Sequence, residues 1–429
     1  MVESNRKLEG IIDNHNLACL SRVHKRKMKK IQGFYNLPLK IKCGTIIKTV
    51  FSVRAGMVSW EKRDLMEENT RKHTAMHIYF APLEGITTYP YRNLHHKYFG
   101  GVEKYFTPFL APGPEQGMSV KEMRDVLPEN NAGVPVVPQI LTNRAGDFLL
   151  TAKKLAEMGY GEINLNLGCP SGTVTAKKKG SGFLLYPDDL DMFFDEVFSD
   201  ASVRNEEFKV SVKTRIGKNE VEEWPEIMAV YNRYPISELT VHPRTQKEFY
   251  KGATHLDVFA DILKESRNPV VYNGDLFTVE DMKKFRGKFP AVETVMIGRG
   301  LIRNPALAEL IRKEENGAEN TFTGESTEAE NKGITLEQPG KSALDSRNTG
   351  TNIMPRIRAF HDEIFEHYRE TMSGDRNLLF RMKDLWSYML AEVPDSEKLA
   401  KKIRKSQHVP EYLAAVDEAF AGWERTERG

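Results

Sequence analysis

Eight short β-rich runs, separated by stretches with helical periodicity, constrain this chain more than any other feature. The runs HIYFAP, KYFTPF, PVVPQI, EINLNL, FKVSVKT, ELTVHP, PVVYNG and ETVMIG occupy residues 77–82, 104–109, 135–140, 162–167, 208–214, 238–243, 269–274 and 293–298. Eight strands alternating with helices are typical of a (β/α)8 barrel. We therefore predict an α/β fold, a TIM barrel. A doubly wound sheet is the alternative, but no GxGxxG turn follows the first strands, which disfavours its dinucleotide-binding form.

Three of the intervening stretches indicate amphipathic helices. Residues 145–159 place Phe148 and Leu155 on one apolar face, and residues 188–200 are expected to form a helix capped by Asp188 or Asp189. In the third stretch, Thr278 and Asp281 have the spacing of a capping box, with Asp in place of Glu.

The barrel is predicted to occupy residues 76–313, with three other regions around it. Residues 1–75 form a basic extension that we expect to be poorly ordered. Residues 1–76 carry 16 Lys and Arg against 7 Asp and Glu, and the densest run is RVHKRKMKK at 22–30. A solvated tail is favoured over an RNA-binding segment. Residues 314–352 contain few large apolar side chains and are predicted to be a disordered linker or insertion.

Residues 353–425 are predicted to form a small C-terminal helical bundle. Sequence with helical periodicity covers residues 353–372, 377–393, 396–407 and 409–423, which predicts four short amphipathic helices. Basic residues on the second and third helices are typical of a solvated surface. On a small appended domain they are also suited to hold a nucleic-acid backbone.

Composition excludes several classes of protein. No run approaches the roughly 20 apolar residues of a membrane helix. The three cysteines, Cys19, Cys43 and Cys169, are too scattered for a disulfide framework, so a cytoplasmic location is expected. No CxxC or HExxH occurs, and neither a metal site nor a protein partner is predicted.

Polar residues and glycines gather where the predicted strands end, which is where barrels carry their chemistry. Taken singly, each has an ordinary explanation as a turn former or a solvated side chain. Seven such ends out of eight favour a functional site, because a barrel core should be rich in Val, Ile and Leu at that depth. The candidate residues are Pro82, Gln139, Asn166, Cys169, Lys213, Arg215, His242, Arg244, Asn273, Gly274, Asp275, Gly298 and Arg299.

The last two strand ends indicate a phosphate site. The segments "NGD" (273–275) and "GRG" (298–300) offer glycine-flanked backbone N–H groups, and Arg299 adds a charge-assisted donor. Loops after strands 7 and 8 frequently bind phosphate in this architecture. Lys213 and His242 are expected to face the middle of the site, where a cation suits the reduced, anionic form of a flavin.

Cys169 ends the fourth run, in INLNLGCPSGTV (163–174). A thiol at this place can be a packing residue, a metal ligand, a disulfide partner, or a working acid or nucleophile. The scattered cysteines disfavour a disulfide, and a metal ion lacks further ligands. A packing role stays open beside a chemical one.

Taken together, several segments resemble the tRNA-dihydrouridine synthase family. They are APLEGITTYPYR (81–92), NLGCPSGTVTAKKKGSGFLL (166–185), VKTRIG (212–217), TVHPRT (240–245), VVYNGD (270–275) and VMIGRGLIRNP (295–305). The resemblance covers roughly residues 76–423 apart from 314–352. It implies an FMN barrel, reduced by NADPH, that saturates the C5–C6 bond of a uridine in tRNA.

The resemblance also implies roles for the strand-end residues. Cys169 is the expected catalytic acid, because a thiol with a pKa near 8.5 still carries its proton at neutral pH. Asn166, Arg215 and Arg244 are expected near the substrate, and the C-terminal bundle is expected to bind tRNA. The expected FMN contacts are Pro82, Gln139, Lys213, His242, Asn273, Gly274, Asp275, Gly298 and Arg299. Glu84 and the segment ILTN after Gln139 depart from the common pattern, so the target nucleotide is not identified.

Two other functions are weighed. An FMN barrel acting on a small pyrimidine needs no basic helical appendage, and a non-catalytic tRNA-binding protein needs no intact Cys169, Lys213 and His242. Both are therefore disfavoured. Within the resembling region, TAKKKGSG (175–182) is further hypothesised to be a mobile basic loop that closes on RNA.

Overall fold

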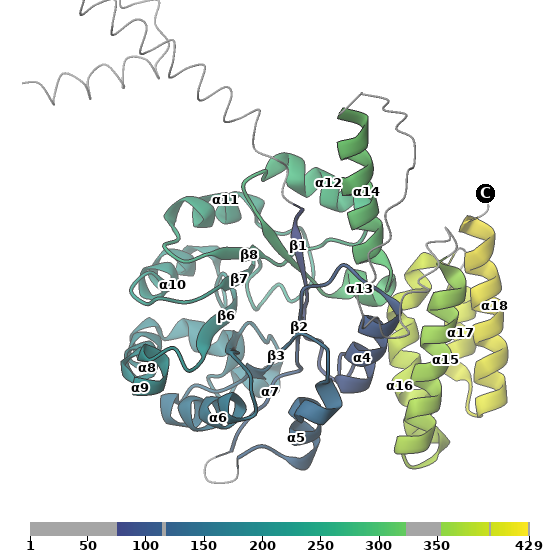
Figure 1. The fold of residues 1–429 in the computed structure, drawn as a ribbon, viewed down its shortest axis with the longest axis horizontal. Coiled ribbons are helices and arrows are strands. Elements are labelled where there is room, and N and C mark those ends of the chain that lie inside the picture. Colours follow the sequence, from purple (N-terminus) through teal and green to yellow (C-terminus); the bar gives the residue numbers. More distant parts are fainter. Residues whose placement is uncertain (1–74, 114–116, 323–352, 394–395, 428–429) are drawn as a thin grey trace, which may run out of the picture. The chain divides into compact units, whose positions relative to one another are not determined.

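A computed structural model describes residues 75–113, 117–322, 353–393 and 396–427, and its strands form one parallel sheet (Figure 1). The sheet order is β3-β2-β1-β9-β8-β7-β6-β5-β4. The strands are β1 (His77–Phe80), β2 (Lys104–Phe106), β3 (Val136–Val137), β4 (Gln139–Ile140), β5 (Glu162–Leu167), β6 (Lys209–Arg215), β7 (Leu239–His242), β8 (Val270–Tyr272) and β9 (Thr294–Ile297). All eight predicted runs are confirmed, and the third run supplies two strands.

Pro138 divides that third run, because proline has no N–H to give to a strand ladder. On one side of it β3 pairs with β2, and on the other side β4 pairs with β5. The same short run therefore joins both ends of the sheet order, and the sheet closes into a barrel. The α/β barrel prediction is confirmed.

Helices surround the strands (Figure 1). In the barrel region they are α4 (Tyr89–Tyr98), α5 (Val120–Val126), α6 (Ala145–Glu157), α7 (Gly172–Thr175), α8 (Pro187–Ser199), α9 (Ala201–Arg204), α10 (Trp224–Tyr231), α11 (Leu256–Glu265), α12 (Val279–Lys288), α13 (Arg299–Arg303) and α14 (Leu307–Phe322). The helices predicted at 145–159 and 188–200 correspond to α6 and α8. Among the described residues, no helix is both long and apolar enough to cross a membrane.

The capping predictions had mixed outcomes. At α12, the Thr278 side chain accepts a hydrogen bond from the Asp281 N–H, and the Asp281 carboxylate accepts one from the Thr278 N–H, so the capping box is confirmed. At α8, the predicted Asp cap is wrong. Pro187 occupies the first helical turn, which its fixed φ favours, and both aspartates follow it inside that turn.

The helix α14 reaches further than the sequence indicated. Its continuation to Phe322 makes the first residues of the predicted 314–352 linker helical. Glu314 and Glu315 form ion pairs with Lys283 and Arg286 of α12, and these pairs hold the extra turns against the barrel. The remainder of that segment and the predicted extension up to residue 74 lie outside the described residues.

Four helices follow, as predicted: α15 (Met354–Thr371), α16 (Gly374–Met389), α17 (Ser396–Lys405) and α18 (Val409–Glu427). They pack around buried Trp386, Tyr412 and Phe420. α15 packs on α4, and α16 packs on α13. In addition, the Arg381 guanidinium of α16 donates to the Gly85 carbonyl oxygen, at 2.6 Å, in the loop after β1.

The interior of the barrel is polar along one side. Lys104 of β2 forms ion pairs with Glu162 and Glu238, both at 2.8 Å. Glu162 also accepts from the Ser211 hydroxyl, at 2.7 Å. An apolar patch of Tyr79, Phe106, Val137, Val271 and Met296 fills the rest. These ion pairs lie where β2, β5 and β7 begin, at the opposite ends of the strands from the predicted site residues.

Candidate active site

The predicted site residues lie together where β5 to β9 end. The strand register places Asn166 opposite Lys213, and Arg215 opposite His242. Asn273 and Arg299 follow the next two strands of the ring. Parallel strands bring their carboxyl ends to one face, so residues separated by more than a hundred positions meet there.

Cys169 is held in place through its backbone. The Asn166 side-chain oxygen accepts from the N–H groups of Gly168, at 3.0 Å, and Cys169, at 2.9 Å. The Ser181 hydroxyl donates to the Cys169 carbonyl oxygen at 2.8 Å. Arg215 donates to the Gly168 carbonyl oxygen at 3.0 Å. The thiol therefore starts from a fixed position at the end of β5.

Burial raises the pKa of the Cys169 thiol. The Ser171 N–H and the charges of Arg215 and Lys213 act in the opposite direction without reversing the shift. The group is therefore protonated at neutral pH. A protonated thiol suits a proton donor, whereas a nucleophile needs the thiolate.

The segment after Cys169 packs tightly on it. Gly180 has φ +57°, and a Cβ at this position would lie 2.9 Å from the Cys169 carbonyl oxygen. Only glycine fits such a contact. Lys177, Lys178 and Lys179 lie between Cys169 and Gly180, and the Lys178 ammonium is 4.0 Å from the centre of the Tyr186 ring. The hypothesised loop at 175–182 thus has a fixed end, and its movement stays a prediction.

A column of buried amides supports Asn166 from below. Asn166 donates to the Gln139 side-chain oxygen at 2.6 Å, and Gln139 donates to Asn164 at 2.8 Å. Asn164 in turn donates to the Ser211 hydroxyl at 2.9 Å. Sequence reasoning missed Asn164 and Ser211. The alternation of Asn164 and Asn166 in EINLNL was the available signal, because residues two apart on a strand share a face.

Positive charge is concentrated on the other side of the site, in a group that we call the mouth cluster: Lys213, Arg215, Arg244, Asp275 and Arg299. Arg244 is fully buried and donates to both Asp275 oxygens, at 3.0 and 2.5 Å. Arg299 donates to Asp275 at 2.6 Å. Among the described residues, Asp275 is the one carboxylate that pairs with any of these cations. It pairs with Arg244 and Arg299, whereas Lys213 and Arg215 form no ion pair with a carboxylate in the part of the chain that the structure describes.

This crowding shifts the titration of its members. The pKa of Lys213 falls to about 7, first because of burial and second because of the Arg215 charge. The pKa of His242 lies well below its usual value, because of burial and the four surrounding cations, so its imidazole is neutral at pH 7. Burial lowers the pKa of Arg215 to about 10. An anion bound here would relieve this repulsion.

Three predicted contacts acquire a clearer interpretation. The two terminal nitrogens of Arg244 contact Asp275, the Gly252 carbonyl oxygen and His242, which favours positioning over a contact with substrate. Asp275 orients two arginines, which favours the same role over direct cofactor binding. Asn273 donates to the Met296 carbonyl oxygen at 2.7 Å.

The glycines have packing reasons of their own. A Cβ on Gly274 would overlap the buried Tyr272 hydroxyl at 1.9 Å, and one on Gly298 would meet the Ala81 Cβ, next to Pro82, at 3.3 Å. These glycines therefore do not by themselves indicate a phosphate site. The charge of the mouth cluster carries that inference.

Tyr250 is a site residue that the sequence reasoning missed. It lies in the loop after β7, with its ring centre 5.3 Å from the Arg215 guanidinium, 4.6 Å from that of Arg299 and 5.9 Å from the His242 ring. It is 52% exposed. An exposed aromatic pair, Phe249 and Tyr250, seven residues after a strand-end histidine was the available signal.

The residues present fit a flavin nucleotide. Within the described ranges, the Lys213 ammonium has no hydrogen-bond or ion-pair partner, although it lies among other cations. Neutral His242 lies near it, and the four cations have one carboxylate among them, Asp275, which pairs with Arg244 and Arg299. Buried positive charge is retained when a ligand supplies the missing negative charge, as a flavin phosphate and its ring carbonyls would.

Comparisons with known proteins agree with this geometry. Residues 79–375 match the family described as dihydrouridine synthase (Dus). A probable tRNA-dihydrouridine synthase of Staphylococcus aureus (strain COL) is 29% identical over 249 residues, which are 56% of this chain and 72% of the relative. The tRNA-dihydrouridine synthase B of Pasteurella multocida is 28% identical over 231 residues, 54% of this chain and 67% of the relative.

Proposed function

We propose that this chain, which belongs to the dihydrouridine synthase family, reduces the C5–C6 double bond of specific uridines in tRNA. The observation that carries the proposal is a protonated thiol, Cys169, fixed at the end of β5 within reach of the charges of Arg215 and Lys213, which also act on a neutral histidine, His242. A proton donor next to a site for an anionic redox cofactor is what the reduction requires.

FMN is the proposed cofactor, and NADPH is the proposed electron donor. When bound, FMN would supply the hydride that adds to C6 of the uracil ring. Lys213 and Arg299 would hold its negative charge, with His242, Asn273 and the backbone around Gly274 and Gly298 beside it. Pro82 is a further proposed contact, because its neighbours Ala81 and Leu83 lie against Gly298.

The chain's own part in the reaction is the second hydrogen. The Cys169 Sγ donates its proton to C5, so that one hydride and one proton complete the reduction. The thiolate left behind is stabilised by Arg215 and Lys213, whose charges lower the thiol pKa. The amide column keeps Sγ in place by fixing the Cys169 backbone.

The tRNA substrate is the part of the proposal that the C-terminal helices support. A uridine must leave its stack before its ring can enter a barrel mouth. The third helix of the bundle, α17, carries Lys398, Lys401, Lys402, Arg404 and Lys405, and such a basic face suits a phosphate backbone. A cytoplasmic location remains the expectation from the cysteine pattern.

Mass spectrometry of tRNA tests the proposal. Unmodified tRNA is incubated with the flavin-loaded protein and NADPH, and uridines that gain two hydrogen atoms are mapped by position. Cys169→Ala is expected to keep the flavin absorbance but lose about 10²–10⁴-fold in dihydrouridine formation, because the acid is gone. Product formed at an unchanged rate would remove Cys169 from this role.

The same assay separates the alternatives. Turnover of free uridine or orotate while tRNA stays unmodified would favour the small-pyrimidine oxidoreductase. Tight tRNA binding without any reduction by the wild-type protein would favour the non-catalytic one.

A further inference from the structure

A cavity separate from the candidate active site lies between the barrel and the C-terminal helices, with a volume of about 350 Å³. Its lining comes from the loop after β1, from the start of α4, from α5 and from the end of α15, and Arg381 of α16 closes one side. No residue assigned above to the flavin or to proton donation lines it. A cavity of this size is within the range that holds small ligands.

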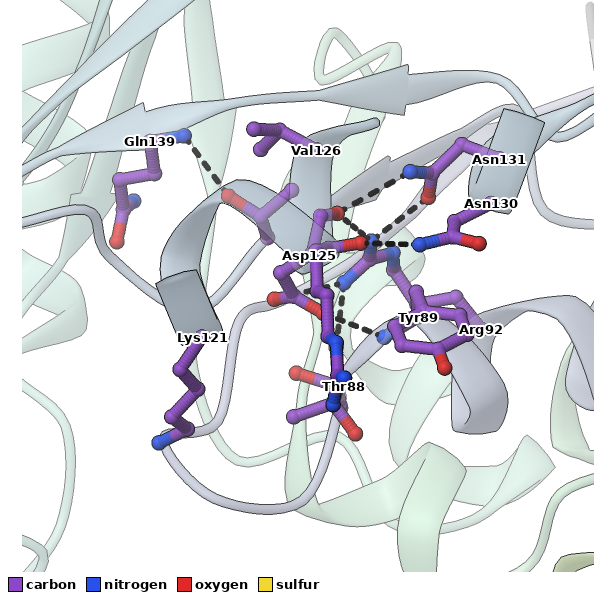
Figure 2. A network of polar contacts seen from close by, with 12 residues as sticks. Thr88, Tyr89, Arg92, Lys121, Asp125, Val126, Asn130, Asn131 and Gln139 are labelled. Carbon is purple, nitrogen blue, oxygen red and sulfur yellow. Dashed lines mark hydrogen bonds and ion pairs between the residues drawn. The ribbon is translucent and has the colours of Figure 1, made fainter. Parts of the chain in front are cut away.

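The wall formed by α4 and α5 is built in advance, by a group that we call the Arg92 cluster: Arg92, Asp125 and Asn131. Arg92 is 1% exposed and donates to the Asp125 carbonyl oxygen at 2.7 Å and to the Asn131 side chain at 2.8 Å (Figure 2). The Tyr89 N–H donates to the Asp125 carboxylate at 2.6 Å. Asp125 lines the cavity, so its position there is fixed before any ligand arrives.

The side chains that face the cavity combine flat rings with cations. Tyr89 and His367 meet edge to face, with ring centres 5.8 Å apart, and Tyr368 lies beside His367. Burial lowers the pKa of His367, so that ring is neutral at pH 7. Lys121, Arg124 and Arg381 supply positive charge, and the carboxylates of Glu84, Glu122 and Asp125 line the cavity as well. Glu84 pairs with Lys121 and Asp125 with Arg92, whereas Arg124 and Arg381 have no carboxylate partner among the described residues. Aromatic faces for a base together with cations for a phosphate are the usual features of a nucleotide site.

The cavity adjoins the proposed active site. Glu84 lines the cavity, and its charge acts on the Cys169 thiol. α16 borders both places as well. Arg381 lines the cavity, while Tyr388, two turns further along, is near enough to Arg299 for that charge to act on its hydroxyl. Residues seven apart on a helix share a face.

We propose that this cavity binds a second unpaired nucleotide of the same RNA that presents the uridine, with its base against Tyr89 and His367. The proposal rests on the tRNA function proposed above. By requiring two flipped nucleotides at a set separation, the protein selects which uridine is reduced. The nicotinamide cofactor also contains a base and phosphates, so its binding is an alternative that the test must separate.

The test is a double-mutant cycle that combines substitutions in the protein with abasic positions in the RNA. Once the reduced uridine is mapped, tRNA transcripts are made with an abasic residue at each neighbouring position in turn. Tyr89→Leu keeps the backbone N–H that holds Asp125, and His367→Leu gives a second, independent change. Tyr98→Leu, at the far end of the same helix α4 and outside the cavity, is the matched control.

For one abasic position, we expect kcat/KM of the wild-type protein to fall about tenfold, as the loss of one stacked base implies. Tyr89→Leu and His367→Leu should show a similar loss on intact tRNA and little further loss on that transcript, whereas Tyr98→Leu should behave as wild type. If the loss in kcat/KM from the protein variant and the loss from the abasic residue multiply at every position, the two act independently and the proposal is wrong. A slower reduction of the flavin by NADPH without RNA would assign the cavity to the nicotinamide cofactor instead. Failure of the proposed function is distinct, because the wild-type protein would then form no dihydrouridine.

Discussion

The Arg92 cluster and the mouth cluster each bury an arginine against an aspartate, yet they leave opposite amounts of charge. Arg92 meets one carboxylate, Asp125, and also donates to the Thr87 and Asp125 carbonyl oxygens and to the Asn131 side chain, while its buried Nε has no partner among the described residues. The mouth cluster holds four cations, and its one carboxylate, Asp275, pairs with two of them, Arg244 and Arg299. The first group is balanced in charge, with one carboxylate for its one arginine, whereas the second carries more positive than negative charge and suits an anionic ligand. The comparison shows that a buried arginine is informative through the charges it leaves unmatched.

Removing the cation of the Arg92 cluster should give the largest effect on stability. Arg92→Met leaves Asp125 buried without its cation, so we expect the free energy of unfolding in urea to fall by about 3–5 kcal/mol. Lys97→Met, an exposed position on the same helix, should change it by about 0.5 kcal/mol or less. A loss below about 1 kcal/mol for Arg92→Met would show that the cluster does not hold α4 to α5.

A change in the mouth cluster should affect ligand binding instead of stability. Arg299→Met is expected to weaken FMN binding by about tenfold to a hundredfold, because a charge-assisted hydrogen bond is lost. The unfolding free energy of the flavin-free protein should change little, since neighbouring cations lose a repulsive partner. Arg303→Met on the same helix α13 is the matched control, and equal weakening by both variants would contradict a specific role for Arg299.

The two clusters should also differ in pH dependence, because only the mouth cluster contains a cation whose pKa lies near neutrality. In the flavin-free protein, the Lys213 ammonium is protonated below pH 7 and neutral above it. Binding that needs the charged form is therefore constant below pH 7 and weakens above it, by at most about tenfold per pH unit. Titration of FMN affinity from pH 6 to 9 checks this. Lys213→Met should abolish the dependence, and an unchanged slope would assign it to another group.

The smallest effect is expected outside both clusters, at the exposed lysines after Cys169. Replacing Lys177, Lys178 and Lys179 by Ala should raise KM for tRNA by a few-fold, with intact FMN binding and a shallower dependence on salt. Lys283→Ala with Lys284→Ala on α12 is the control. If turnover and salt dependence both stay unchanged, the lysines do not contact RNA.

Structural features that depend on neighbouring residues in the sequence were predictable. Contacts that form only when the strands close into a barrel were not. Short β-rich runs identified all eight strand regions, and three-residue spacing identified the α12 capping box. The position of Cys169 at a strand end followed from strand order alone. These features need only the chain's own periodicity.

Side-chain partners across the barrel were harder to predict. Nothing in the sequence pairs Arg244 with Asp275 or Lys104 with Glu238, because such pairs depend on how the strands stagger when the ring closes. Asn164 and Tyr250 were missed for the same reason, since each acquires its meaning from residues on other strands. The extra turns of α14 likewise depend on ion pairs with α12.

The half-buried position of Cys169 has a consequence for chemical labelling. Alkylating reagents and peroxides attack the thiolate, and a thiol whose pKa is raised by burial presents little of it at neutral pH. Cys169 should therefore react with iodoacetamide more slowly than a free cysteine does. A residue that keeps its proton for a substrate would, by the same property, be protected from oxidation between turnovers.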